Sequence, residues 1–151
     1  MPAATAPRPR SAYPHFLELQ TRWMDNDVYG HVNNVVYYSY FDTAVNRFLI
    51  DRGVLDIRTG PVIGYVVDSA CRYLRPLAFP CAVHAGVRVG RLGSSSVRYE
   101  IGLFRDDEDE AAAEGHFVHV YVDRRTERPT PLPDPVRAAL ETLVVVGSDE
   151  G

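Results

Sequence analysis

Residues 35–53, VVYYSYFDTAVNRFLIDRG, decide how this chain folds. Their apolar side chains recur with helical spacing and fall on one face of a helix, at Tyr37, Phe41, Ala44, Val45 and Phe48. Asn33 and Asn34 stand before the segment as capping residues, and Gly53 follows it where a left-handed residue is expected to end the helix. Because the polar stripe is narrow, most of the helix must be covered by something large. A sheet wrapped around the helix is the simplest cover.

Strand patterns surround this helix. Before it, residues 17–23 alternate between apolar and polar side chains. After Gly60, four further segments have strand character, namely 61–74, 83–90, 97–103 and 117–122, and we expect them to follow one another as long antiparallel hairpins. The order of one strand, one long helix and four strands predicts an α+β domain, with the helix packed on one face of a curved sheet.

Composition places the chain among ordinary globular proteins. It has 151 residues, of which 46% are hydrophobic and 24% charged, enough for one domain with its own core. The net charge of −4 gives no global positive field, so neither a nucleic acid nor an anionic membrane is expected as a partner. The spacing of Cys71 and Cys81 fits neither a redox pair nor a zinc site.

The two ends of the chain are rich in proline. Four prolines within residues 1–14 favour a flexible N-terminal tail, and prolines at 129, 131, 133 and 135 indicate a stiff linker before a short C-terminal helix over 135–143. The main domain is therefore expected over residues 15–128, with the linker, helix and tail over 129–151. No apolar run has the length of a secretory signal or a membrane span, which predicts a cytoplasmic protein.

The stretch richest in chemistry is residues 25–34, DNDVYGHVNN, between the first strand and the helix. A helix N-terminus presents unpaired backbone N–H groups that can hold a developing oxyanion. A carboxylate beside a carbonyl held in this way can attack it or activate a water. The alternative, on these residues alone, is that Asp25 and Asp27 are turn and capping residues and that His31 is a structural side chain.

Residues 25–37, DNDVYGHVNNVVY, closely resemble the signature of hotdog-fold thioesterases of the 4-hydroxybenzoyl-CoA thioesterase superfamily. The resemblance includes Tyr40-Phe41-Asp42, residues 72–77 (RYLRPL) and residues 91–96 (RLGSSS), and covers roughly residues 16–123. It implies a hotdog fold, in which a curved antiparallel sheet wraps around one long central helix.

The resemblance also implies roles for individual residues of the loop. Asp27 corresponds to the catalytic carboxylate, and Asp25 to a residue that supports the loop. Asn34 is in the position whose backbone N–H binds the thioester oxygen. His31 polarises the thioester, orients water or braces the loop. Tyr29, which stands where the similar plant acyl carrier protein thioesterases carry an asparagine, is assigned to substrate binding together with Asn33.

Coenzyme A brings phosphates and a pantetheine arm, and the resemblance places the contacts to that arm at Gly93, Ser94, Ser95 and Ser96. The sequence does not select the arginines for the phosphates; Arg91 is one candidate and is assigned to substrate binding. Arg72, Arg75 and Arg88 are further candidates.

Two related chemistries are less favoured. Another hotdog branch uses an acid on the central helix after a His-Gly-Gly motif, which this chain lacks, so Asp42 is a reserve candidate only. Hydratase-type hotdogs resemble D-x-N-P-x-H, whereas Asp27 and His31 are four residues apart with no proline between them. Reversible hydration is therefore not expected.

The resemblance thus predicts a thioester hydrolase that cleaves acyl-CoA to a free acid and CoA. The mechanism is expected to need no metal and no cofactor beyond the CoA of the substrate. The protein is expected to form a homodimer or homotetramer, with the substrate groove between subunits. The alternatives are an acyl-acyl carrier protein thioesterase and a non-catalytic module that binds acyl thioesters.

Overall fold

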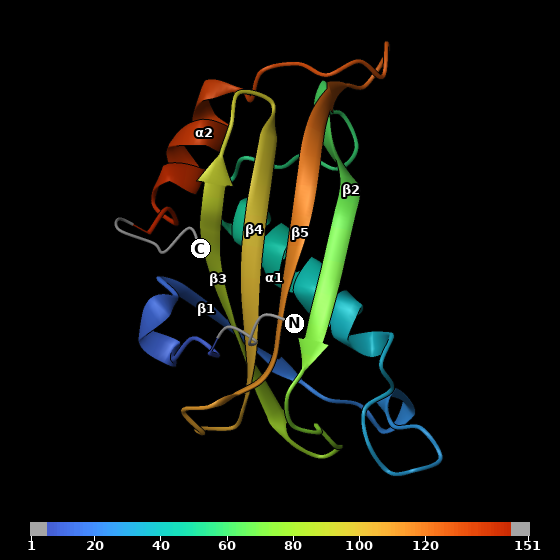
Figure 1. The fold of residues 1–151 in the computed structure, drawn as a ribbon. Coiled ribbons are helices and arrows are strands. Elements are labelled where there is room, and N and C mark those ends of the chain that lie inside the picture. Colours follow the sequence, from blue (N-terminus) through green and yellow to red (C-terminus); the bar gives the residue numbers. More distant parts are fainter. Residues whose placement is uncertain (1–5, 146–151) are drawn as a thin grey trace, which may run out of the picture.

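The computed structural model describes residues 6–145. Five strands and two α-helices make up the fold (Figure 1): β1 (His15–Gln20), α1 (Val36–Asp51), β2 (Val62–Tyr73), β3 (Ala82–Leu92), β4 (Ser96–Arg105), β5 (Ala111–Asp123) and α2 (Asp134–Glu141). Two short 3-10 helices, Arg10–Ala12 and Trp23–Asp25, flank β1.

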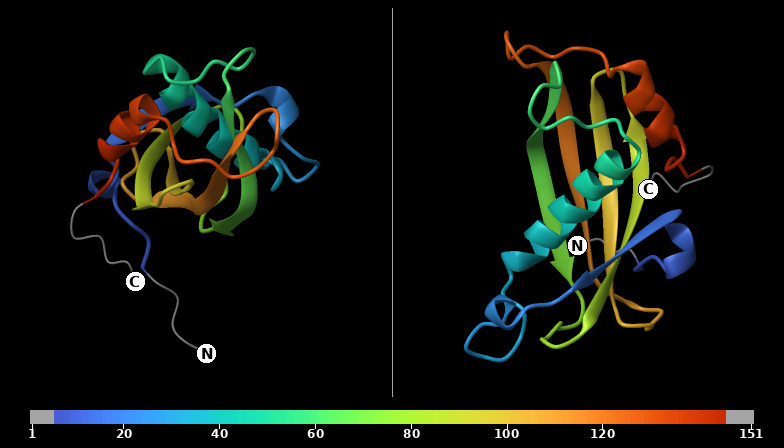
Figure 2. Two further views of the ribbon diagram at one scale, coloured as in Figure 1. Left: turned by 90° about the horizontal axis from the view of Figure 1, so that it is seen from above. Right: turned by 180° about the vertical axis from the view of Figure 1, so that it is seen from behind.

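The five strands form one antiparallel sheet in the order β1-β3-β4-β5-β2. The sheet curves, and α1 runs along its concave side, as the views from above and behind show (Figure 2). We call this side of the sheet the helix side and the opposite side the outer face. The predicted α+β architecture, a curved antiparallel sheet around one long helix, is confirmed.

The position of β2 differs from the expected succession of hairpins. β2 pairs with β5 along its whole length, from Val62 opposite Asp123 to Tyr73 opposite Ala113, while β3 pairs with β1 and β4. An alternating pattern fixes which face of a strand is buried, but it does not fix which strand lies next to it. As a result β2 is an edge strand, with no second neighbour among the described residues.

The core lies between α1 and the sheet. Seven side chains of α1 are buried, including Phe41 and Phe48, which are almost completely enclosed. Gly115 of β5 allows this approach, because a Cβ atom there would lie 2.3 Å from the ring of Phe41. Each fully buried aromatic side chain contributes roughly 1.5–3 kcal/mol. These contacts fix α1, and with it the loop that precedes it.

The ends of α1 agree only in part with the sequence prediction. Gly53 has a φ of +71° directly after the helix, as expected for its C′ residue. At the other end Val35 is the N-cap and no side chain caps the helix. The Asn33 side chain instead accepts a hydrogen bond from the Val35 N–H at 3.1 Å, in an Asx turn.

The N-terminal segment is the largest departure from expectation. The sequence predicted a flexible tail over residues 1–14, but residues 7–13 lie across the outer face of the sheet. Tyr13 is 4% exposed and packs over Gly86 and Gly102, where a Cβ atom would lie 2.7 Å from it. Two glycines on adjacent strands leave the space in which the Tyr13 ring packs. The proline content of the segment, on which the prediction rested, does not indicate such a contact.

At the C-terminus, α2 begins one residue before the short helix predicted over 135–143 and ends two residues earlier than predicted. Within the described part of the chain, no helix has the length and apolar character needed to cross a membrane.

Candidate active site

A cleft of about 390 Å³ opens where the loop before α1 meets the end of β2. It is lined by residues of the loop, of the first turn of α1 and of the segment after β2, namely Asp27, Tyr29, His31, Val32, Asn34, Tyr37, Tyr73, Leu74, Arg75 and Pro76. Asp27, His31 and Asn34, the three predicted catalytic residues, therefore border one cavity.

The backbone of the loop is closed by its own hydrogen bonds. The Asp27 N–H donates to the His31 carbonyl at 2.8 Å, and the Gly30 N–H donates to the Asp27 carbonyl at 3.1 Å. Gly30 has a φ of +83°, a conformation that glycine adopts without strain. The turn holds the Asp27 side chain at the cleft, where its Oδ1 accepts a hydrogen bond from the Tyr29 N–H at 2.8 Å. Asp27 forms no ion pair with any residue of the range 6–145.

Asp25, two residues earlier, is in a different environment. Its side chain is buried and accepts hydrogen bonds from the Tyr40 hydroxyl at 2.7 Å and from the Arg22 guanidinium at 2.9 Å. Burial by itself would raise the pKa of Asp25, but the hydrogen bonds from Tyr40 and Arg22 outweigh it, and the pKa lies below its ordinary value. Asp25 thus joins the loop to α1.

The backbone N–H of Asn34 is the group that the resemblance implies as the oxyanion donor. Its backbone N–H has no acceptor within residues 6–145, although the N–H groups of Asn33, Val35 and Val36 are all bound. Its carbonyl accepts a hydrogen bond from the Tyr73 hydroxyl at 3.0 Å. Burial, together with the nearby Cys71, raises the pKa of Tyr73 to about 12, so the hydroxyl remains a donor at neutral pH. A free N–H at the start of α1 is suited to hold a developing oxyanion.

The other predicted loop residues differ in their contacts. The His31 side chain is exposed at the cleft and has no hydrogen-bond partner in the described range. Tyr29 also borders the cleft and is 83% exposed. Asn33 is bound within the loop, where its N–H donates to the Asp25 carbonyl at 2.8 Å. It does not line the cleft.

The predicted contacts to the pantetheine arm lie elsewhere in the chain. The turn between β3 and β4 contains Gly93, Ser94, Ser95 and Ser96. The Ser95 carbonyl accepts a hydrogen bond from the Tyr121 N–H, and Tyr121 pairs with Gly64 near the start of β2. The Asp27 cleft lies at the opposite end of β2. A strand of this length spans roughly 35 Å. One chain therefore does not bring this turn, or the adjoining Arg91, to Asp27.

The remaining arginine candidates are separated as well. Arg75 borders the cleft, where it forms ion pairs with Glu108 and Glu110. Arg72 and Arg88 lie on the outer face, in ion pairs with Glu114 and Glu100.

Asp42, the reserve candidate, is exposed on α1 and accepts a hydrogen bond from Asn46 at 2.9 Å.

Sequence reasoning missed the contribution of Tyr73, the last residue of β2. Tyr37 and Tyr73 line the cleft with their rings in edge-to-face contact, 4.9 Å apart. The motif at residues 72–77 carried part of the family resemblance, but no site role was assigned to its tyrosine.

Comparison with known proteins agrees with this geometry. Residues 21–140 match the model of the thioesterase-like superfamily, and the chain belongs to that superfamily. The predicted resemblance to hotdog thioesterases is confirmed, and with it the class of thioester hydrolases.

Two solved structures and one curated relative show how close the similarity is. The PA5185 protein from Pseudomonas aeruginosa is 54% identical, with a TM-score of 0.90, over 93% of this chain and 98% of its own. A thioesterase from Thermus thermophilus, solved in complex with coenzyme A and Zn, is 34% identical, with a TM-score of 0.72, over 87% of this chain and 95% of its own. A chloroplastic acyl-acyl carrier protein thioesterase of Arabidopsis thaliana is 26% identical over 127 residues, 82% of this chain. The match spans only 66% of the length of that relative.

Proposed function

We propose that this protein hydrolyses acyl-CoA thioesters to a free acid and CoA in the Asp27 cleft. One observation carries the proposal: a carboxylate and an unpaired backbone N–H at a helix N-terminus border the same cavity. These are the two groups that acyl transfer by a carboxylate requires.

The thioester carbonyl oxygen would accept a hydrogen bond from the Asn34 N–H, which stabilises the negative charge of the tetrahedral intermediate. Asp27 then has two routes. As a nucleophile it attacks the carbonyl carbon, the C–S bond breaks, the thiolate takes up a proton, and water hydrolyses the acyl-aspartyl anhydride. As a general base it accepts a proton from the water that attacks the same carbon; the C–S bond then breaks, and the proton passes from Asp27 to the thiolate. His31, which borders the cleft, would orient that water or the thioester.

Coenzyme A is the favoured carrier of the acyl group. The Thermus thermophilus relative was solved with coenzyme A, and Arg75 places a half-exposed guanidinium at the cleft. The Arabidopsis thaliana relative favours acyl carrier protein as the second candidate. An acidic carrier protein needs a basic docking face, and the net charge of −4 makes this chain less suited to it. We retain the expectations that neither a metal nor another cofactor is needed and that the protein is cytoplasmic.

A second copy of the chain is part of the proposal. β2 is a 12-residue edge strand that exposes Tyr65, Val66, Val67 and Tyr73 by 42–59%. Long apolar edges of this kind bind another strand. Antiparallel pairing of two β2 strands about a two-fold axis would bring the start of one β2 to the end of the other. The Gly93–Ser96 turn of one subunit would thereby approach the Asp27 cleft of its partner, where the predicted contacts to the pantetheine arm belong.

Release of free thiol from a panel of acyl-CoA thioesters with short, long and aromatic acyl groups tests the function, with matched acyl-acyl carrier protein substrates as the second arm. We expect turnover of at least one acyl-CoA and a loss of at least about a hundredfold in the Asp27→Asn variant, which keeps the size of the side chain but removes the carboxylate. Turnover of acyl carrier protein substrates alone would select the second candidate. Binding of an acyl-CoA without any thiol release would instead favour the non-catalytic module.

A further inference from the structure

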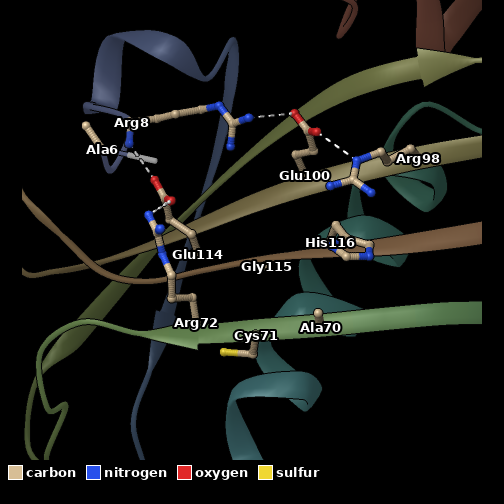
Figure 3. A pocket seen from close by; sticks show the side chains of 10 residues that line it. All are labelled: Ala6, Arg8, Ala70, Cys71, Arg72, Arg98, Glu100, Glu114, Gly115 and His116. Carbon is tan, nitrogen blue, oxygen red and sulfur yellow. Dashed lines mark hydrogen bonds and ion pairs between the residues drawn. The ribbon is translucent and has the colours of Figure 1, made fainter. Parts of the chain in front are cut away.

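A second cavity, of about 300 Å³, lies on the outer face of the sheet (Figure 3). Five charged side chains and one imidazole border it, from the N-terminal segment and from β2, β4 and β5: Arg8, Arg72, Arg98, Glu100, Glu114 and His116. We call it the outer-face pocket. The function proposed above does not use it.

The two glutamates form the floor of the pocket and hold the arginines in place. Glu100 lies 2.9 Å from Arg98, 3.0 Å from Arg88 and 3.5 Å from Arg8. Glu114 lies 3.0 Å from Arg72 and also accepts a hydrogen bond from the backbone N–H of Arg8. The Glu100 and Glu114 side chains are only 9% and 11% exposed, so both carboxylates are largely removed from water and already paired.

The pocket carries a surplus of positive charge. Three arginines and two glutamates line it, which leaves one positive charge unbalanced in a chain whose net charge is −4. Arg88, which does not line the pocket, pairs with Glu100 from beside it and adds a further positive charge. His116 binds Asp68, whose side chain is 65% exposed and does not line the pocket. Arg91, opposite Arg98 in the pairing of β3 with β4, adds a further exposed guanidinium nearby.

The guanidinium groups also have unused donors. The side chains of Arg8, Arg72 and Arg98 are 28%, 35% and 41% exposed. Among the described residues, Arg98 donates only through Nε, to Glu100, and Arg72 only through one terminal nitrogen, to Glu114. The other N–H groups of each planar fork remain free, and two parallel N–H donors match the oxygens of a phosphate.

We propose that the outer-face pocket binds the phosphate of a small organic phosphate, with Arg72 and Arg98 as the principal donors and Arg8 as the third. The arginines border a cavity and are held by largely buried acids, which suits a small ligand rather than the flat surface of a macromolecule. The volume exceeds that of inorganic phosphate, so part of the organic group would be enclosed as well.

Two sources supply this chemistry. One is a free phosphorylated metabolite, and the other is the nucleotide end of a CoA substrate. Arg75 borders both the Asp27 cleft and a groove along residues 7–9, and Arg8 borders both that groove and the outer-face pocket. These cavities follow one another around the end of the sheet. The second source rests on the proposed function, whereas the first does not.

Isothermal titration calorimetry with inorganic pyrophosphate and with adenosine 3′,5′-bisphosphate tests the site. We expect both probes to bind the wild type and at least about tenfold weaker binding to Arg72→Gln and Arg98→Gln. Arg98→Lys keeps the positive charge beside Glu100 and serves as a second variant if glutamine destabilises the fold. It should also bind more weakly, because an ammonium lacks the planar fork. Arg47→Gln is the matched control, since Arg47 is exposed and pairs with a single carboxylate, that of Asp51 on α1.

The outcomes separate the two sources and the two proposals. If the Arg72 and Arg98 variants raise KM for acyl-CoA and leave kcat unchanged, the ligand is the nucleotide end of the substrate. If they lose pyrophosphate binding with KM unchanged, the ligand is a separate metabolite. Both results support the site. The calorimetric binding measurement tests the site even if no thioester is hydrolysed. Failure of the folded wild type to bind either probe would overturn the proposal, as would equal weakening in Arg47→Gln.

Discussion

The Asp27 cleft and the outer-face pocket lie on opposite sides of one sheet. They differ in how many partners bind their carboxylates. In the cleft, the Asp27 carboxylate accepts a single hydrogen bond, from the Tyr29 N–H, and the Asn34 N–H has no acceptor within residues 6–145. In the outer-face pocket, each glutamate is largely buried and held by two or more cationic or N–H groups. A carboxylate with few partners is available for chemistry, whereas a fully paired one stabilises the fold and positions its neighbours.

The largest expected effect comes from separating subunits at the β2 edge. Val67→Lys places a charge on a side chain that is 59% exposed on this edge. We expect dissociation to monomers and loss of thioester hydrolysis, because the cleft would lose the residues of the partner. Analytical ultracentrifugation and thiol release measure the two effects. Pyrophosphate binding in the outer-face pocket should survive, since one chain supplies that pocket.

Val144→Lys is the matched control for this substitution. Val144 is 41% exposed beside Val89 of β3, toward the other edge of the sheet. A fully active monomer of Val67→Lys would show that the cleft needs no partner.

The next largest effect is on the free energy of unfolding, through the ion pairs of the outer face. Glu100→Gln removes the carboxylate that neutralises Arg88, whose side chain is only 5% exposed. We expect a loss of about 3 kcal/mol in the free energy of unfolding, because a buried cation is left unpaired. Denaturant titration measures it, and kcat of the remaining folded protein should stay within about twofold of the wild type.

Asp51→Asn provides the comparison on the surface, since it breaks an exposed pair with Arg47. Its expected cost is about 0.5 kcal/mol or less. Equal costs for the two variants would mean that the outer-face charges are no better satisfied than surface pairs.

The smallest effect concerns the tether of the oxyanion donor. Tyr73→Phe removes the hydrogen bond to the Asn34 carbonyl, worth about 1 kcal/mol, and we expect a decrease of about fivefold in kcat. Steady-state kinetics measures it. Tyr65→Phe is the control on the same strand, as Tyr65 is similarly exposed and its hydroxyl has no partner in the described range. An unchanged kcat in Tyr73→Phe would show that the N–H is positioned by other contacts.

Much of the fold could be predicted because it depends on local patterns. The spacing of Tyr37, Phe41 and Phe48 defines the buried face of α1, and Gly53 ends the helix at the expected place. The pairing of β2 with β5 could not be predicted, since strand order depends on contacts between distant segments. The packing of Tyr13 over Gly86 and Gly102 could not be predicted for the same reason.

For the candidate site, too, the sequence predicted the part that depends on contiguous residues and not the part that depends on distant contacts. The DNDVYGHVNN loop is contiguous, so its motif brought Asp27, His31 and Asn34 to one cleft. The sequence could not show which arginines lie at the cleft. Side chains alternate along a strand, so Arg72 lies on the outer face while its neighbour Tyr73 lies at the cleft. The Gly93–Ser96 turn lies far from Asp27 within one chain, and only an assembly of two chains would join them.

The most direct test compares the two aspartates of the loop, Asp25→Asn and Asp27→Asn, for both turnover and unfolding. We predict that Asp27→Asn loses at least about a hundredfold in kcat with an unchanged unfolding free energy. Asp25→Asn should instead lose about 1.5–3 kcal/mol of stability, because Asp25 accepts hydrogen bonds from Tyr40 and Arg22. A folded Asp27→Asn variant with kcat within tenfold of the wild type would contradict the assignment of the reactive carboxylate.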